Sequence, residues 1–156
     1  MKKINQHSWT ALIVLAAFVA LSSFALKPGT HSFQVYLDNK MIADQYVSRN
    51  MVVPVVALDP SEKHDDIIVK YSECGKTVSG RTITLKSDRD KVLKDWHFNG
   101  TTSGFKDPMT IKVQDIIALK VNDGATLKLV YSSDDFKEGQ EIASLVVGKN
   151  VKASLK

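Results

Sequence analysis

The chain has 156 residues, of which 44% are hydrophobic and 24% are charged, and it contains one cysteine. Its formal net charge of +4 is spread along the chain without a cluster of Lys or Arg, which argues against a nucleic-acid-binding surface. Because a single cysteine cannot form an internal disulfide, we expect the hydrophobic core alone to hold the fold together.

The first 25 residues have the three-part pattern of a secretory signal peptide. Lys2 and Lys3 are followed by an uncharged, mostly apolar run over 11–26, with small residues at Ser23 and Ala25. The run is shorter than the roughly 20 residues that a membrane-spanning helix needs, although an uncleaved anchor is the alternative. We therefore predict a bacterial-type signal peptide at 1–25, cleaved near Ala25. The mature protein would be periplasmic or extracellular, without stable membrane insertion.

The first half of the remaining chain is typical of short strands. Apolar and polar residues alternate over 32–38 and again over 41–47, with the turn Asp38-Asn39-Lys40 between them, which predicts a hairpin. The apolar run 51–58 contains Pro54, and proline favours an edge position because it cannot donate to a strand ladder. A further strand follows at 67–73, before a loop over 74–80.

The second half of the chain continues the same pattern. The stretch 81–98 predicts a hairpin whose core residues are Ile83, Leu85, Trp96 and Phe98. After a loop over 99–108, we expect a strand at 109–113, a short helical turn near 113–119 and strands at 125–132 and 142–147. About nine short strands at regular spacing predict an all-β fold, an antiparallel β-sandwich or a small barrel. The absence of a βαβ pattern argues against a parallel sheet. We assign 26–148 to one β-sandwich domain and 149–156 to a basic C-terminal tail.

One corner of this pattern resembles immunoglobulin-like domains. Residues 110–113, the helical turn and the strand 127–131 resemble the late-strand corner of that class, in which an inward tyrosine ties the corner by a hydrogen bond. The paired cysteines of antibody domains are absent, so the resemblance implies the sandwich class and no function.

Metal and catalytic signals are sparse. His31, His64 and His97 are widely spaced, and the candidate metal ligands that lie closest together are His64, Asp65 and Asp66. The acidic loops around Asp90 and Asp134 lack the spacing of a calcium site. No catalytic motif is present. We predict that Cys74 is a buried apolar side chain, and the alternatives are a free thiol or an intermolecular link. The sequence therefore predicts no cofactor and no enzyme.

Aromatic residues outside the predicted core are the candidate binding residues. They are Tyr36 and Tyr46 on strands and Phe105 and Phe136 in loops. We predict an exported, non-catalytic binding or interaction module for a protein or glycan ligand, of undetermined oligomeric state. One alternative is an assembly subunit that uses strand addition at the 51–58 edge, and the other is a metal carrier or thiol-dependent enzyme.

Overall fold

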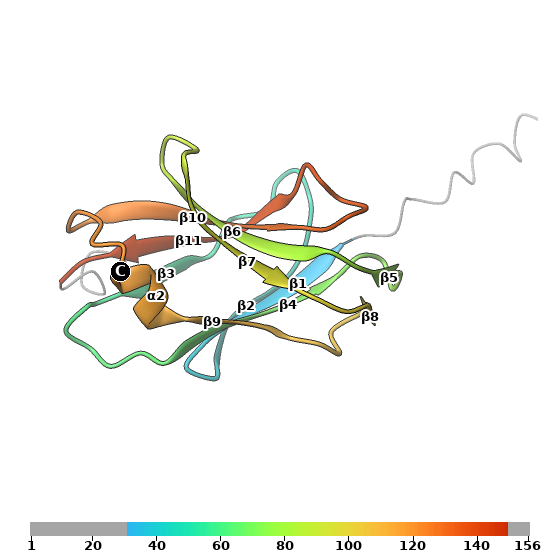
Figure 1. Ribbon diagram of the computed structural model, residues 1–156, viewed down its shortest axis with the longest axis horizontal. Coiled ribbons are helices and arrows are strands. Elements are labelled where there is room, and N and C mark those ends of the chain that lie inside the picture. Colours follow the sequence, from blue (N-terminus) through green and yellow to red (C-terminus); the bar gives the residue numbers. More distant parts are fainter. Residues whose placement is uncertain (1–30, 150–156) are drawn as a thin grey trace, which may run out of the picture.

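The structure, a computed structural model, describes residues 31–149 and is built from strands, with one short helix (Figure 1). The first sheet has the strand order β2-β1-β4-β9. Its members are β1 (Ser32–Leu37), β2 (Lys40–Tyr46), β4 (Asp66–Ser72) and β9 (Met109–Lys112). All its neighbours are antiparallel. The predicted all-β fold is thus confirmed.

The second sheet has the order β3-β11-β10-β6-β7. Its members are β3 (Val55–Leu58), β6 (Arg81–Ser87), β7 (Val92–Phe98), β10 (Ala125–Ser132) and β11 (Gln140–Val147). Two very short strands, β5 (Thr77–Val78) and β8 (Thr102–Ser103), pair with each other at one end of the molecule (Figure 1). The helix α2 (Val113–Ile117) follows β9 directly, as the sequence predicts.

The two sheets share one hydrophobic core. Alternate residues of β1, β4, β6 and β10 are buried, and apolar residues of both sheets belong to the same cluster. Tyr71 of β4 and Tyr131 of β10 stack with their ring centroids 3.8 Å apart, so the sheets are in direct contact there. Ile83 and Leu85 are fully buried, as predicted.

Several predictions about packing are wrong in detail. The pair β3–β11 is parallel, because Val55 to Leu58 align in the same direction as Ser144 to Val147. Trp96 and Phe98 are only partly buried, since β7 is the edge of its sheet. Tyr131 does not tie the corner to nearby backbone, because its hydroxyl donates to the buried Glu73 carboxylate at 2.9 Å.

The predicted burial of Cys74 is also wrong, because the residue is half-exposed. It follows β4 in a turn and has a φ of +57°, a left-handed backbone conformation that residues other than glycine rarely adopt. The inward-facing pattern of the strand ends one residue before Cys74, since Glu73 is the buried residue at this end of β4.

The ends of the chain carry two further predictions. The signal peptide at 1–25 and all of the tail except Lys149 lie outside the described residues. Between residues 31 and 149, no helix has the length and apolar character needed to cross a membrane.

Candidate metal site around His64

A hairpin turn places the first residue of the site. Asp38 and Asn39 join β1 to β2 with φ angles of 50° and 64°, and two successive left-handed residues define the tight turn that suits the twist of a hairpin. Asp adopts this conformation more readily than most residues. Because β4 is the neighbour of β1, the turn lies beside the start of β4, and the Asp38 backbone N–H donates to the Asp66 carbonyl at 3.0 Å.

The connection from β3 to β4 places the other residues. The Asp59 carboxylate accepts hydrogen bonds from the backbone N–H and the hydroxyl of Ser61, at 2.8 and 2.6 Å, and the Asp59 carbonyl accepts one from the Glu62 N–H at 3.0 Å. This tight turn brings Glu62 back beside His64.

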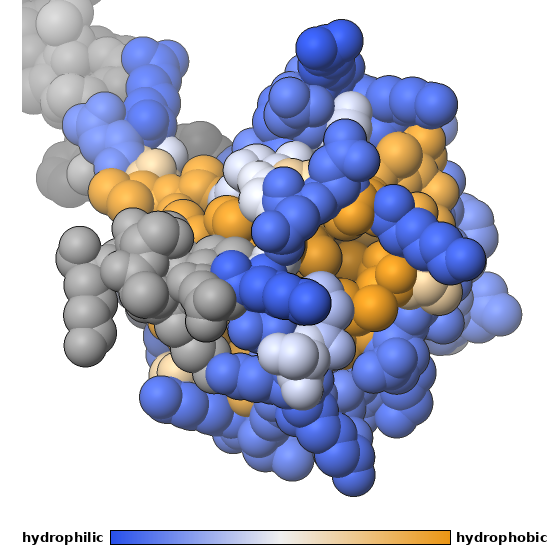
Figure 2. Space-filling view, turned by 90° about the vertical axis from the view of Figure 1, so that its left-hand side faces the viewer, coloured by the Kyte–Doolittle hydropathy of each residue, from blue (hydrophilic) through white to orange (hydrophobic). Residues whose placement is uncertain are grey.

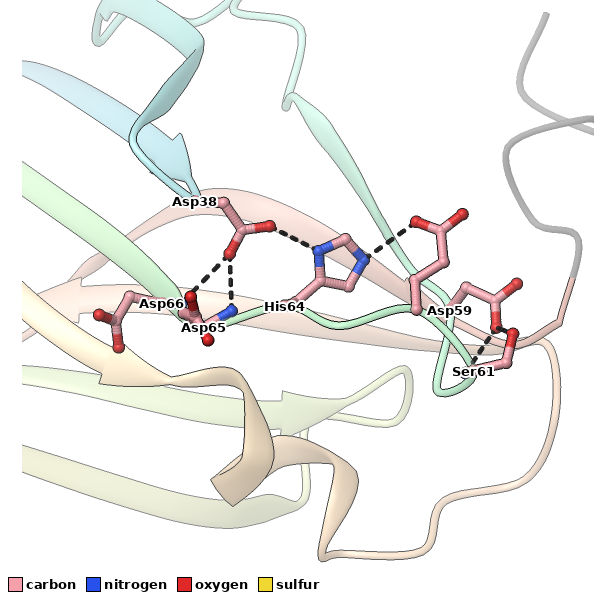
Figure 3. A network of polar contacts seen from close by, with 7 residues as sticks. Asp38, Asp59, Ser61, His64, Asp65 and Asp66 are labelled. Atoms are coloured by element: carbon pink, nitrogen blue, oxygen red, sulfur yellow. Dashed lines mark hydrogen bonds and ion pairs between the residues drawn. The ribbon is translucent and has the colours of Figure 1, made fainter.

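His64 is held between two carboxylates. Its side chain is buried, its Nδ1 lies 2.7 Å from Asp38 Oδ2, and its Nε2 lies 3.5 Å from Glu62 Oε2 (Figure 3). The second contact lacks hydrogen-bond geometry. Within residues 31–149, Nε2 of His64 has no hydrogen-bond partner although it is shielded from solvent. A buried polar atom without a partner is uncommon and indicates a missing ligand or water.

The electrostatics of Asp38 fix the tautomer of His64. Burial acts to raise the pKa of Asp38, but hydrogen bonds from His64 and from the backbone N–H groups of Asp65 and Asp66 outweigh it and lower the pKa below its usual value. The carboxylate is therefore ionised at neutral pH and can only accept. Nδ1 of His64 must then carry a proton, so that the neutral form of the ring has its lone pair on Nε2. This carboxylate–histidine arrangement is the one that orients histidine ligands of metals.

The distance between the two candidate ligand atoms fits a shared ion. Two ligands that each lie about 2.1 Å from a tetrahedral metal are about 3.4 Å apart, and Nε2 of His64 and Oε2 of Glu62 are separated by 3.5 Å. His64 also lines an open groove of about 420 Å³, whose walls include Leu37, Ile42 and Val55. The site thus offers one imidazole and one carboxylate, with a second carboxylate behind the ring.

Of the three residues predicted as metal ligands, only the His64 side chain takes part in this cluster with Asp38 and Glu62. Asp65 contributes its backbone N–H to Asp38, and Asp66 is paired with Lys112 Nζ at 2.8 Å. Sequence reasoning missed Asp38 and Glu62. The turn Asp59-Pro60-Ser61, directly before Glu62, is the one sequence feature that could have placed Glu62 near His64. The contact between Asp38 and His64 depends on the pairing of β1 with β4, which the sequence does not predict.

The other candidate ligands lie elsewhere. His31 Nδ1 is hydrogen-bonded to the Tyr71 hydroxyl at 3.0 Å. His97 contacts the Thr82 hydroxyl on the exposed side of β7. Cys74 follows the far end of β4, so roughly 20 Å of strand separates it from the start of β4 near His64. No group of three metal-ligating side chains occurs anywhere in the described part of the chain.

The four candidate binding aromatics do not form one surface. Tyr46 is 73% exposed at the end of β2, while Tyr36 is half-buried and donates its hydroxyl hydrogen to Gln34. Phe136 packs against the core with its ring 4.9 Å from His31, so it closes one end of the core. Phe105 is half-buried in the loop before β9.

A further groove lies at the end of the molecule that Figure 2 shows, where apolar surface is framed by hydrophilic side chains. It has a volume of about 690 Å³ between the β6–β7 turn and the segment before β10, with Leu93 and Leu127 in its wall. None of its lining residues is a histidine or cysteine, so it adds nothing to the metal site.

The fold and the site together define an all-β protein with one buried histidine oriented by a carboxylate. No family model matches the chain. Over 106 residues, which are 67% of this chain, it is 29% identical to the iron-sulfur cluster assembly protein SufA of Plasmodium berghei (strain Anka). The matched region spans 61% of the length of that relative.

This similarity corrects the function predicted from the sequence. An exported, non-catalytic binding or interaction module does not agree with a relative that is named for iron-sulfur cluster assembly. The predicted periplasmic or extracellular location and the secreted, immunoglobulin-like character are wrong on the same finding.

Proposed function

We propose that this protein is a metal carrier that binds one divalent transition-metal ion, iron(II), at His64 and Glu62 and passes it on for iron-sulfur cluster assembly. The observation that carries the proposal is the buried Nε2 of His64, which has no hydrogen-bond partner among residues 31–149 and lies 3.5 Å from Glu62 Oε2. Imidazole nitrogen and carboxylate oxygen are both ligands of iron(II).

The charges of the site suit a divalent cation. Asp38 and Glu62 supply two carboxylates around a neutral imidazole, so a bound ion with two positive charges would be compensated locally. Asp38 would remain behind the ring and keep Nε2 directed at the ion. Mutation of a carboxylate that hydrogen-bonds to a metal-ligating histidine typically costs 10–100-fold in metal affinity.

The residues do not fit an iron-sulfur cluster held by one chain. Such clusters are usually bound by four cysteine thiolates, and this chain contains only Cys74. A site with two protein ligands leaves positions for water or for the ligands of an acceptor, which is suited to transfer. The cargo we propose is therefore the ion and not the assembled cluster.

The similarity to a protein named for iron-sulfur cluster assembly favours a metal carrier over a subunit that assembles by strand addition. It concerns only part of that relative, so participation in cluster assembly is itself a proposal. A thiol-dependent enzyme receives no support from the geometry, because Cys74 lies far from His64 along β4.

Anaerobic titration of the purified protein with iron(II), and with cobalt(II) as a spectroscopic substitute, tests the proposal. We expect one equivalent to bind per chain and cobalt absorption bands that indicate nitrogen and oxygen ligands. His64→Gln and Glu62→Gln should each lose this binding, while His97→Gln, on the exposed side of β7, should retain it. Absence of one-to-one binding, or binding unchanged in His64→Gln, would refute the proposal.

A further inference from the structure

Arg81 is a buried arginine without an acidic partner. Its side chain shares the inward face of β6 with Ile83 and Leu85, and the residue is only 4% exposed. None of the ion pairs among residues 31–149 includes it. Arginine is almost never fully buried unless it is paired, because removing an uncompensated charge from water is costly.

The hydrogen bonds of Arg81 leave its Nε group without a partner. Nη1 donates to the Asp107 backbone carbonyl at 2.7 Å, which fixes the side chain but does not neutralise its charge. Nε is shielded from solvent and has no partner within the described residues. The edge formed by Nε and Nη2 is the fork that binds carboxylate, sulfate or phosphate oxygens through two parallel hydrogen bonds.

A second buried polar group without a partner lies at the same end of the molecule. Thr102 of β8 is 5% exposed, and its Oγ1 has no hydrogen-bond partner within residues 31–149. Thr102 pairs with Val78 of β5, and Arg81 begins β6 three residues after Val78. The topology therefore brings the start of β6, with Arg81, and the β5–β8 pair, with Thr102, to the same end of the molecule (Figure 1).

Two further cations lie in the loops at this end of the molecule. Lys76 and Lys106, in the two loops that contain β5 and β8, are exposed and take part in no ion pair in the described part of the chain. Two carboxylates also lie at this end: Asp134 accepts from the Ser79 hydroxyl at 2.8 Å and the buried Glu73 from the Tyr131 hydroxyl at 2.9 Å. Within residues 31–149 neither forms an ion pair with Arg81.

We propose that Arg81 and Thr102 form a binding site for an oxyanion, with the Nε and Nη2 groups of Arg81 and the hydroxyl of Thr102 as donors. The ligand class is a small oxyanion, or a molecule that carries a carboxylate, sulfate or phosphate group. Entry requires the β5–β8 pair to move aside. Strands of two residues form few hydrogen bonds, so this opening is one of the less costly in the fold.

Thermal unfolding in increasing phosphate, sulfate or acetate tests the site, with chloride at matched ionic strength as the reference. We expect a saturable rise in Tm, on the order of 10 °C when the anion exceeds its Kd about a hundredfold. The rank of the three anions identifies the preferred oxyanion. If none stabilises the protein more than chloride does, the proposal is wrong.

Two variants separate a binding site from general screening of charge. Arg81→Met should abolish the saturable response, whereas the same substitution at the exposed turn residue, Arg89→Met, should keep it. Thr102→Val, which preserves the shape of the side chain, should weaken anion binding about tenfold. A folded Arg81→Met that still responds would overturn the proposal. If Arg81→Met fails to fold, the Thr102→Val variant decides. The proposal is overturned if its half-maximal rise in Tm occurs at the same anion concentration as in the native protein.

Discussion

The substitution Asp38→Asn tests the electrostatic design of the His64 site, because it removes a charge and keeps the shape of the side chain. In the native protein the Asp38 carboxylate accepts from His64 Nδ1 at 2.7 Å and from the backbone N–H groups of Asp65 and Asp66 at 2.7 and 3.4 Å. An asparagine has only one oxygen with which to accept, so it cannot replace all three hydrogen bonds.

The expected size of the effect follows from these contacts. If the asparagine oxygen accepts from Asp65, its NH₂ group faces His64 and drives the ring proton from Nδ1 to Nε2. Hydrogen bonds to a charged group contribute about 1.5–3 kcal/mol, against about 0.5–1.5 kcal/mol for neutral pairs. Because Asp38 is 35% exposed and partly screened, we expect a loss of about 1 kcal/mol in the free energy of unfolding. Metal affinity should fall roughly 10–100-fold, since Nε2 no longer presents a lone pair.

Urea unfolding followed by circular dichroism at pH 7 measures the first effect, and cobalt(II) titration measures the second. Asp65→Asn is the matched control: it changes a carboxylate in the same loop, but the Asp65 contact with Asp38 is made by its backbone. The control should stay within about 0.5 kcal/mol of the native protein. An Asp38→Asn variant with native stability and native metal affinity would show that the carboxylate does not orient the histidine.

Two further predictions concern stability alone. Tyr131→Phe should cost about 1–3 kcal/mol in urea unfolding, because it leaves the buried Glu73 carboxylate without the donor that lies 2.9 Å away; a cost near zero would mean that another group satisfies Glu73. Two hydrogen bonds lower the pKa of Asp115, and the one from Trp96 Nε1 has a larger effect than the one from Lys94. Burial acts in the opposite direction and raises this pKa. This carboxylate therefore stabilises the fold above its unfolded pKa of about 3.9 and loses that contribution as pH falls through the lower folded value. Asp115→Asn should accordingly reduce stability at pH 6 more than at pH 2, and equal losses at both pH values would contradict the assignment.

The sequence predicts those parts of the fold that alternation alone determines. Residues 32–37, 81–87 and 125–132 alternate between buried and half-buried positions, as their apolar spacing indicates. A strand of two residues is too short to show alternation of apolar and polar residues. The sequence therefore predicts loops at the positions of β5 and β8, which have two residues each. Alternation also does not say which strands become neighbours, and for this reason it gives no sign of the parallel β3–β11 pair.

The candidate site shows the same limit. His64 is visible in the sequence as the histidine closest to acidic residues, but the two aspartates that follow it have other partners. Asp38 is visible only as a turn residue. Its role depends on the adjacency of β1 and β4, which joins residues far apart in the chain.

The pairing of β3 also has a consequence for the order in which the protein forms. Val55–Leu58 leaves the ribosome early, yet its neighbour in the sheet is β11, the last strand within residues 31–149. Closing a loop of this length carries a large entropic cost, so the contact forms late. Until synthesis reaches Val147, the apolar segment around β3 has no strand to cover its edge. The interval between these two events is when the nascent chain is most exposed to aggregation and has most need of chaperone protection.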